Sequence, residues 1–83
     1  MVKSLISLRD LSPGSFGRVR KLTAEGIQRR RMLDLGFIYD TKIESLRKSP
    51  SGDPVAYEIR GAVIALRSEE ASQILVELLG TEK

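Results

Sequence analysis

Apolar positions along this chain repeat mainly with the two-residue period of β-strands. A run of five residues shows it most clearly, with apolar side chains at its first, third and fifth positions: Val55, Tyr57 and Ile59. Because alternate side chains of a strand point to opposite faces, this run predicts a strand with those three side chains buried. Residues 62–66 are almost continuously apolar, which predicts the most buried strand of the fold. The Arg60-Gly61 pair between the two runs predicts a tight hairpin turn.

Three further segments carry weaker strand patterns. In the first, Val19 and Leu22 stand at positions of opposite parity, so we expect them on opposite faces of the sheet unless a bulge intervenes. In the last, a continued helix remains an alternative to a closing strand. The three strands are expected over residues 16–23, 41–47 and 74–78.

Residues 26–36 show the period of a helix instead. Most of them are good helix formers, and the segment ends on a glycine, where helices commonly stop in a left-handed conformation. At about 100° per residue, Ile27, Met32 and Leu35 share one side, which predicts that they face the core. Arg31 falls within the same arc, so we expect a structural role for it.

A second, shorter helix is expected after Ser68, with Glu69 and Glu70 at the positive end of the helix dipole. The 83 residues are enough for one small domain, which we expect to span residues 1–83. About five short strands separated by turn signals, with one inserted helix and a short second helix, predict a mainly β fold. Such a pattern is typical of a small barrel that removes its sheet edges by closing on itself.

Charge is spread unevenly along the chain. Residues 1–48 carry 11 Lys and Arg against 5 Asp and Glu, which gives +6. Residues 49–83 carry 3 against 6, which gives −3. The positive half contains the predicted helix, and such a surface attracts nucleic acid, an anionic membrane or an acidic protein. A solvated surface is the simpler explanation at this modest net charge.

Side chains that commonly carry catalysis are scarce. The chain has no histidine and no cysteine, so the commonest general base, the thiolate nucleophile and the usual transition-metal ligands are missing. We therefore expect no enzyme activity, no small-molecule substrate, no cofactor and no metal site, with weak oxygen-only binding of a hard cation left open. No apolar run approaches the ~18 residues that span a bilayer, and the start is too short and too soon charged for a secretory signal. The expected location is the cytoplasm, without direct membrane insertion.

Three consecutive arginines on the predicted helix form the densest positive charge: Arg29, Arg30 and Arg31. On a helix they fan over roughly 200°, so they cannot all contact one small anion. Arg31 is expected to pack its stem along the barrel. Arg29 and Arg30 are expected to meet an acidic surface on another protein.

Several short motifs follow one another along the chain. They are Leu11-Ser12-Pro13-Gly14, then Arg30-Arg31-Met32-Leu33-Asp34-Leu35-Gly36-Phe37, then Gly52-Asp53-Pro54, then Ile64-Ala65-Leu66-Arg67, then Glu70-Ala71 followed by Ile74. Together they resemble the FeoA family, the small cytoplasmic accessory proteins of bacterial ferrous iron uptake. The resemblance covers about residues 7–78 in the family's order and spacing.

The resemblance implies an SH3-like β-barrel with an inserted helix, and transition-metal chemistry at the level of the family. It also implies a partner, the cytoplasmic region of FeoB, the membrane GTPase that carries ferrous iron. That partner would bring the protein to the inner face of the cell membrane. The family usually has a proline-glycine turn after the helix, and Tyr39-Asp40 stands in its place here. Aspartate tolerates left-handed geometry, so we expect the turn to survive, with an exposed or half-exposed ring beside the helix.

For partner binding we select four residues on or just after the helix: Arg29, Arg30, Phe37 and Tyr39. Charge would speed the encounter, and an aromatic anchor would hold the contact. Three alternatives stay open: a nucleic-acid-binding module, a free-standing SH3-like domain related to iron-dependent repressors, and an arginine that stimulates GTP hydrolysis. Nucleic acid ranks lower because aromatic residues are only 5% of the chain.

Overall fold

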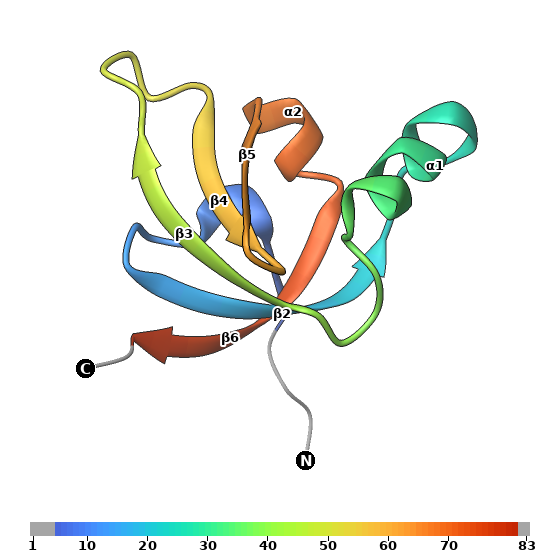
Figure 1. The fold of residues 1–83 in the computed structure, drawn as a ribbon, viewed down its shortest axis with the longest axis horizontal. Coiled ribbons are helices and arrows are strands. Elements are labelled where there is room, and N and C mark those ends of the chain that lie inside the picture. The colour runs from blue at the N-terminus through green and yellow to red at the C-terminus, as the bar shows by residue number, and fades with distance from the viewer. Residues whose placement is uncertain (1–4, 82–83) are drawn as a thin grey trace.

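The computed structural model describes residues 5–81, which fold around one curved antiparallel sheet (Figure 1). Its strands are β1 (Leu5–Ser7), β2 (Ser15–Leu22), β3 (Lys42–Lys48), β4 (Val55–Ile59), β5 (Ala62–Leu66) and β6 (Ile74–Thr81). Neighbouring strands follow the order β1-β6-β2-β3-β4-β5, so β1 and β5 form the two edges. The helical segments are the 3₁₀ turn η1 (Leu8–Asp10), the helix α1 (Gly26–Leu35) and the short helix α2 (Ser68–Ala71).

The predicted mainly β fold with one inserted and one short helix is confirmed. Two details of the sheet go beyond the prediction, however. The sheet has six strands rather than about five, and its two edge strands do not pair with each other, so the expected closure is incomplete. The additional strand is β1, whose three residues are too few to carry a periodic signal.

The core is built from alternate positions of the strands, as the two-residue period requires. Val55, Tyr57 and Ile59 are all buried, which confirms the strongest strand prediction. The Tyr57 hydroxyl donates a hydrogen bond of 3.3 Å to the carbonyl of Leu8, and burial raises the pKa of Tyr57 to about 12. This bond satisfies a phenol that burial would otherwise leave unpaired.

A bulge in β2 reconciles two apolar residues of opposite parity. Val19 and Leu22 are both buried, although a regular strand would place them on opposite faces. The pairing register between β2 and β6 shifts between Val19 and Lys21. The shift returns Leu22 to the core side, as the sequence allowed for.

Strand β5 is not the most buried strand, so that prediction was wrong. Leu66 alone among its residues is buried, and Val63 is 62% exposed. The reason is position, because β5 pairs with β4 on one side and forms the sheet edge on the other. The hairpin turn before β5 is confirmed, with positive φ angles at Arg60 (53°) and Gly61 (85°).

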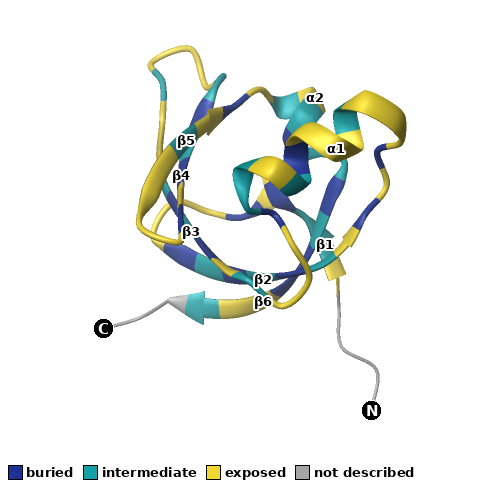
Figure 2. Ribbon diagram, turned by 45° about the vertical axis from the view of Figure 1, so that its right-hand side comes forward, coloured by how far each residue is buried: buried dark blue, intermediate teal, exposed yellow. Residues whose placement is uncertain are grey.

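Helix α1 has the predicted limits, and it ends at Gly36 with a left-handed φ of 110°. Its predicted apolar face is only partly correct. Met32 is buried, but Ile27 in the first turn of the helix is 89% exposed. Figure 2 shows most of α1 exposed, whereas β2 is mainly buried or intermediate.

Helix α2 starts one residue earlier than predicted, at the expected cap itself. The capping residue is Arg67 instead of Ser68, and the backbone N–H of Arg67 donates to the Glu70 carboxylate at 3.0 Å. Glutamate therefore stands at the third helical position and satisfies the cap N–H, which is one half of a capping box; the N–H of Glu70 donates to the backbone carbonyl of Arg67 at 2.9 Å. After α2, residues 74–81 form a strand, so the helical alternative for this segment is excluded.

Candidate functional site

Three of the four residues selected for partner binding lie together. Arg29, Phe37 and Tyr39 line one open pocket of about 320 Å³ between α1 and β2. A second hollow of about 490 Å³ shares Lys21 and Arg29 with it and continues toward the start of α1. We call the two together the α1–β2 groove. Its lining residues are Val19, Arg20, Lys21, Leu22, Thr23, Ala24, Glu25, Gly26, Arg29, Leu33, Phe37 and Tyr39.

Phe37 cannot serve as an exposed anchor, so its selection needs correction. Its side chain is fully buried, and it forms part of the floor of the groove. The helix stop explains this position, because the N–H groups of Gly36 and Phe37 bond to carbonyls of the last turn, at 3.0 Å each. An apolar residue just after such a stop commonly packs back onto the helix. Phe37 therefore supports the surface from beneath.

Tyr39 is the exposed aromatic side chain that the sequence predicted at this place. Its exposed fraction is 70%, and Asp40 after it has the expected left-handed φ of 76°. The backbone N–H of Asp40 donates to the carbonyl of Val19 at 2.8 Å, which fixes the loop on β2. The guanidinium carbon of Arg20 lies 5.2 Å from the centre of the Tyr39 ring, within the range of a cation–π contact.

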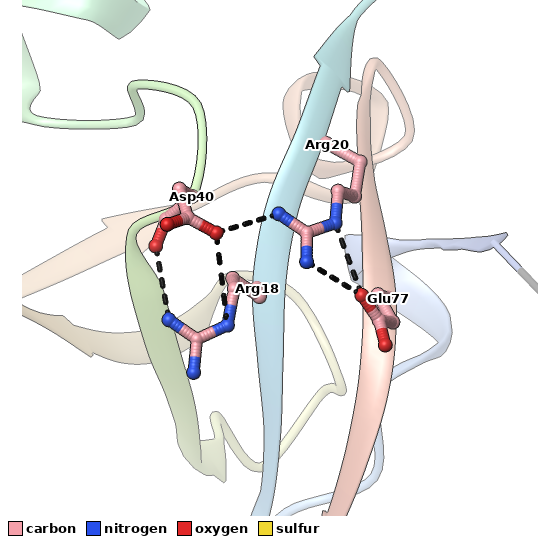
Figure 3. Close-up of polar contacts among 4 residues, drawn as sticks. All are labelled: Arg18, Arg20, Asp40 and Glu77. Atoms are coloured by element: carbon pink, nitrogen blue, oxygen red, sulfur yellow. Dashed lines mark hydrogen bonds and ion pairs between the residues drawn. The ribbon is translucent and has the colours of Figure 1, made fainter. Parts of the chain in front are cut away.

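Arg20 is held by two carboxylates from distant parts of the chain (Figure 3). It donates to Asp40 at 2.7 Å, and to Glu77 on β6 at 2.7 and 3.0 Å. Arg18 adds a bond of 3.1 Å to the carbonyl oxygen of Asp40. The hydrogen bond from Arg20 lowers the pKa of Asp40, and the bonds to Asp40 and Glu77 raise the pKa of Arg20. Asp40 and Arg20 are therefore both charged near neutral pH.

Sequence reasoning missed this network. Glu77 is far from Arg20 in sequence, and only the pairing of β2 with β6 brings them together. The available signal was the alternation of Arg18 and Arg20 within a predicted strand, which places both on the same face. The network holds the loop that carries Tyr39.

The remaining arginines of α1 differ in how their charge is matched. Arg30 pairs with Asp34 one turn further along the helix, at 3.5 Å, with both side chains largely exposed. Arg31 pairs with Glu70, a structural contact made through its charge rather than through the packed stem that the sequence suggested. Arg29 donates to the carbonyl of Leu22 at 3.2 Å.

Arg29 and Lys21 thus differ from Arg20, the third cation that lines the groove. Within residues 5–81, neither lies within ion-pair distance of a carboxylate, whereas Arg20 has two. Both line the two hollows of the α1–β2 groove. The groove therefore combines an apolar floor with positive charge that the described chain leaves unmatched.

Two other kinds of site find no support in the described residues. Among residues 5–81, no three carboxylate side chains gather closely enough to hold a metal ion. None of the helices in that range has the length and apolar character needed to cross a bilayer. The arrangement at the α1–β2 groove is suited to binding an anionic and partly apolar ligand.

Comparison with known proteins adds the family context. The sequence model of the FeoA domain matches residues 6–78. A curated relative from Porphyromonas gingivalis, an Fe(2+) transport protein A/Fe(2+) transporter FeoB fusion protein, is 32% identical over 74 residues. The match covers 89% of this chain but only 9% of that protein.

Solved structures share the fold. A FeoA-like protein from Clostridium acetobutylicum is 36% identical with a TM-score of 0.87, covering 100% of this chain and 95% of its own. FeoA from Stenotrophomonas maltophilia, an SH3 domain protein solved with zinc, is 25% identical with a TM-score of 0.78, covering 87% and 89%. A manganese-dependent transcriptional repressor has a TM-score of 0.83 at 21% identity over 44% of its chain, a likeness of fold alone. The predicted SH3-like fold is confirmed.

Proposed function

This chain belongs to the FeoA family of ferrous iron transport, and from that premise we propose that it docks on the cytoplasmic part of FeoB and modulates it. One observation carries the proposal. In the Porphyromonas gingivalis relative, parts named for the transport protein A and for FeoB stand in a single chain. Fusion keeps two parts at high effective concentration, which benefits a pair that works in contact.

The docking surface we propose consists of the α1–β2 groove with Arg29, Arg30 and Tyr39. Tyr39 offers a large exposed ring that Arg20 already orients, so little freedom is lost when a partner covers it. Arg30 is exposed at the rim and contributes mainly to the rate of encounter. Docking would place the protein in the cytoplasm, beside the membrane in which FeoB lies.

We propose that the effect on FeoB is non-enzymatic. The absence of histidine and cysteine removes the commonest catalytic side chains, and the groove holds no carboxylate pair suited to acid–base work. An arginine that enters the GTPase site remains a testable variant of this proposal. If FeoB hydrolyses GTP at the same rate with the Arg29→Ala and Arg30→Ala proteins as with the parent protein, this variant of the proposal is excluded.

The test is an NMR titration of this protein with the cytoplasmic region of FeoB from the same genome. We expect amide shifts around Arg29 and Tyr39, and weaker binding by the Tyr39→Ser variant. Val63→Ser is a matched control, because Val63 is similarly exposed but lies on the edge strand β5. Absence of shifts at both low and moderate salt, together with failure to co-purify with membrane-embedded FeoB, would contradict the proposal.

A further inference from the structure

We propose that the α1–β2 groove binds an acidic protein segment in which a carboxylate stands next to a large apolar side chain. This inference rests on the proposed docking function and adds the chemistry of the docked segment. It commits to a protein ligand, and it assigns separate tasks to the cations, the floor and the exposed ring of the groove.

The first argument is that two cations of the groove have no carboxylate partner within the described chain. The arginines around the groove are mostly satisfied within the chain, Arg20 by Asp40 and Glu77, and Arg30 by Asp34. Lys21 and Arg29 have no carboxylate within ion-pair distance in residues 5–81, and they border both hollows. A ligand carboxylate between them would give these two cations the pairing that Arg20 and Arg30 already have.

The second argument is the floor beneath these cations. Val19 and Phe37 are fully buried, and Leu33 is partly buried against them, so the base of the groove is apolar. The pocket above them measures about 320 Å³, at the lower end of the range of about 300–1,000 Å³ for small-ligand sites. One large apolar side chain would displace water from this floor, which a bare carboxylate would leave wet.

The third argument is the fixed position of Tyr39 at the end of the groove. Arg20 lies over its ring, and the two carboxylates on Arg20 hold that guanidinium in place (Figure 3). The opposite face of a ring held on one side remains available for an apolar or aromatic side chain. The carboxylates thus orient Tyr39 through Arg20 without contacting the ligand.

Protein fits this surface better than nucleic acid does. Nucleic-acid affinity grows with the number of phosphates neutralised, and the groove offers two unmatched cations. A single-stranded ligand also needs stacking platforms, and Tyr39 is the one exposed aromatic ring at the groove. The carboxylate of Glu25 at the far end of the groove would repel a continuing run of phosphates.

The experiment is a selection from a phage-displayed library of random peptides against the immobilised protein. We expect enriched peptides to carry Asp or Glu beside Leu, Ile or Phe. An enriched peptide, synthesised and titrated, should shift the amides of Lys21, Leu22 and Tyr39. The Lys21→Ser/Arg29→Ser variant should bind it about tenfold more weakly or worse, as expected for loss of charge-assisted hydrogen bonds.

Two control variants separate recognition from folding. Lys48→Ser removes an exposed charge at the end of β3, outside the groove, and should retain binding. Arg29→Lys keeps the charge and should restore part of the affinity that Arg29→Ser loses. Because Arg29 also bonds to the carbonyl of Leu22, the thermal midpoint and the amide spectrum of each variant must match the parent.

Several results would overturn the inference. These are selection of no peptides or of peptides without acidic residues, shifts confined to surfaces away from the groove, and equal binding by the Lys21→Ser/Arg29→Ser variant. Salt-sensitive binding of single-stranded RNA that shifts the groove amides and competes away the peptide would assign the groove to nucleic acid instead. If peptides select as expected but the FeoB region fails to bind, the proposed function fails and the groove chemistry stands. If FeoB binds both the parent and this variant equally, docking stands and the groove chemistry fails.

Discussion

The curved sheet and helix α1 are held in one molecule by different kinds of interaction. The sheet encloses side chains with almost no exposure, such as Val19, Ile43 and Val76. Helix α1 buries Met32 alone among its residues, packs Leu33 and Leu35 partly against the core, and makes further polar contacts. Gln28 donates to Gln73 at 3.1 Å, and Arg31 pairs with Glu70.

Because of this difference, one region stabilises the fold and the other presents side chains that a partner can contact. Burial of an apolar side chain contributes about 1.5–3 kcal/mol, whereas an exposed ion pair contributes about 0–1 kcal/mol. The sheet therefore supplies most of the folding free energy, and α1 presents charged and exposed side chains that can change without unfolding the protein. A partner surface on α1 is consistent with that division, and substitutions in the two regions test it.

The largest effect is expected at Phe37, which follows α1 in sequence but belongs to the core. Phe37→Ala should lower the free energy of unfolding by about 3–5 kcal/mol, because it leaves a cavity in a fully buried site. Urea denaturation monitored by circular dichroism measures the loss. Tyr39→Ala, two residues away but 70% exposed, is the control and should cost far less. Equal losses of unfolding free energy at Phe37 and Tyr39 would contradict the division between a stabilising core and an exposed helix region.

Next in size is the close packing of β2 against β6. A Cβ atom added at Gly17 would lie 2.9 Å from Cγ2 and 3.1 Å from Cβ of Val76, which is buried and has little rotamer freedom. Gly17→Ala should therefore destabilise the protein by about 1–3 kcal/mol through overpacking. Adding Val76→Ala should make room, so the double variant should lose less than the sum of the two single variants. Strict additivity would contradict the steric explanation.

A smaller, pH-dependent effect is expected where α1 meets α2. The hydrogen bond from Arg31 lowers the pKa of Glu70 from its ordinary value of 4.5, followed by the bond from the backbone of Arg67. A lowered pKa in the folded state means that the ionised carboxylate stabilises folding. That stabilisation is complete above the ordinary value and is lost as the pH falls through the lowered one.

Glu70→Gln tests this directly. Near neutral pH it should cost about 0.5–1 kcal/mol, as for a partly exposed ion pair. At a pH below the lowered pKa the parent carboxyl is also uncharged, so the difference between parent and variant should vanish. Urea midpoints of both proteins across acidic pH measure it. If the urea midpoints of parent and variant differ by the same amount at every pH, the loss of stability comes from the changed side-chain geometry rather than from the lost charge.

The sequence predicted those parts of the fold that depend on local pattern. Val55, Tyr57 and Ile59 alternate within one strand, and the glycine stop of α1 needs only its own backbone angle, so both were correct. The burial of Ala62–Leu66 was wrong, because an apolar run does not reveal whether its strand lies at the centre or the edge of a sheet.

The candidate site was predictable to a similar extent. Tyr39 was expected to be exposed because a turn follows the helix, and it is. Phe37 was misjudged, since its burial depends on how the chain packs back after the helix stop. The bond between Arg20 and Glu77 depends on the pairing of β2 with β6, which no local pattern encodes.

The smallest effect on stability is expected at Ile27, in the first turn of α1. The helical period placed it toward the core, yet its side chain is 89% exposed, so Ile27→Ser should change the free energy of unfolding by no more than about 0.5 kcal/mol. Isoleucine and serine have similar helix propensities, so the helix itself should persist. A loss comparable to that of Phe37→Ala would mean that the first turn packs in solution, and would break the division between sheet and helix. If stability is unchanged but binding of FeoB weakens, Ile27 is an apolar part of the docking surface and the contact extends past the groove along α1.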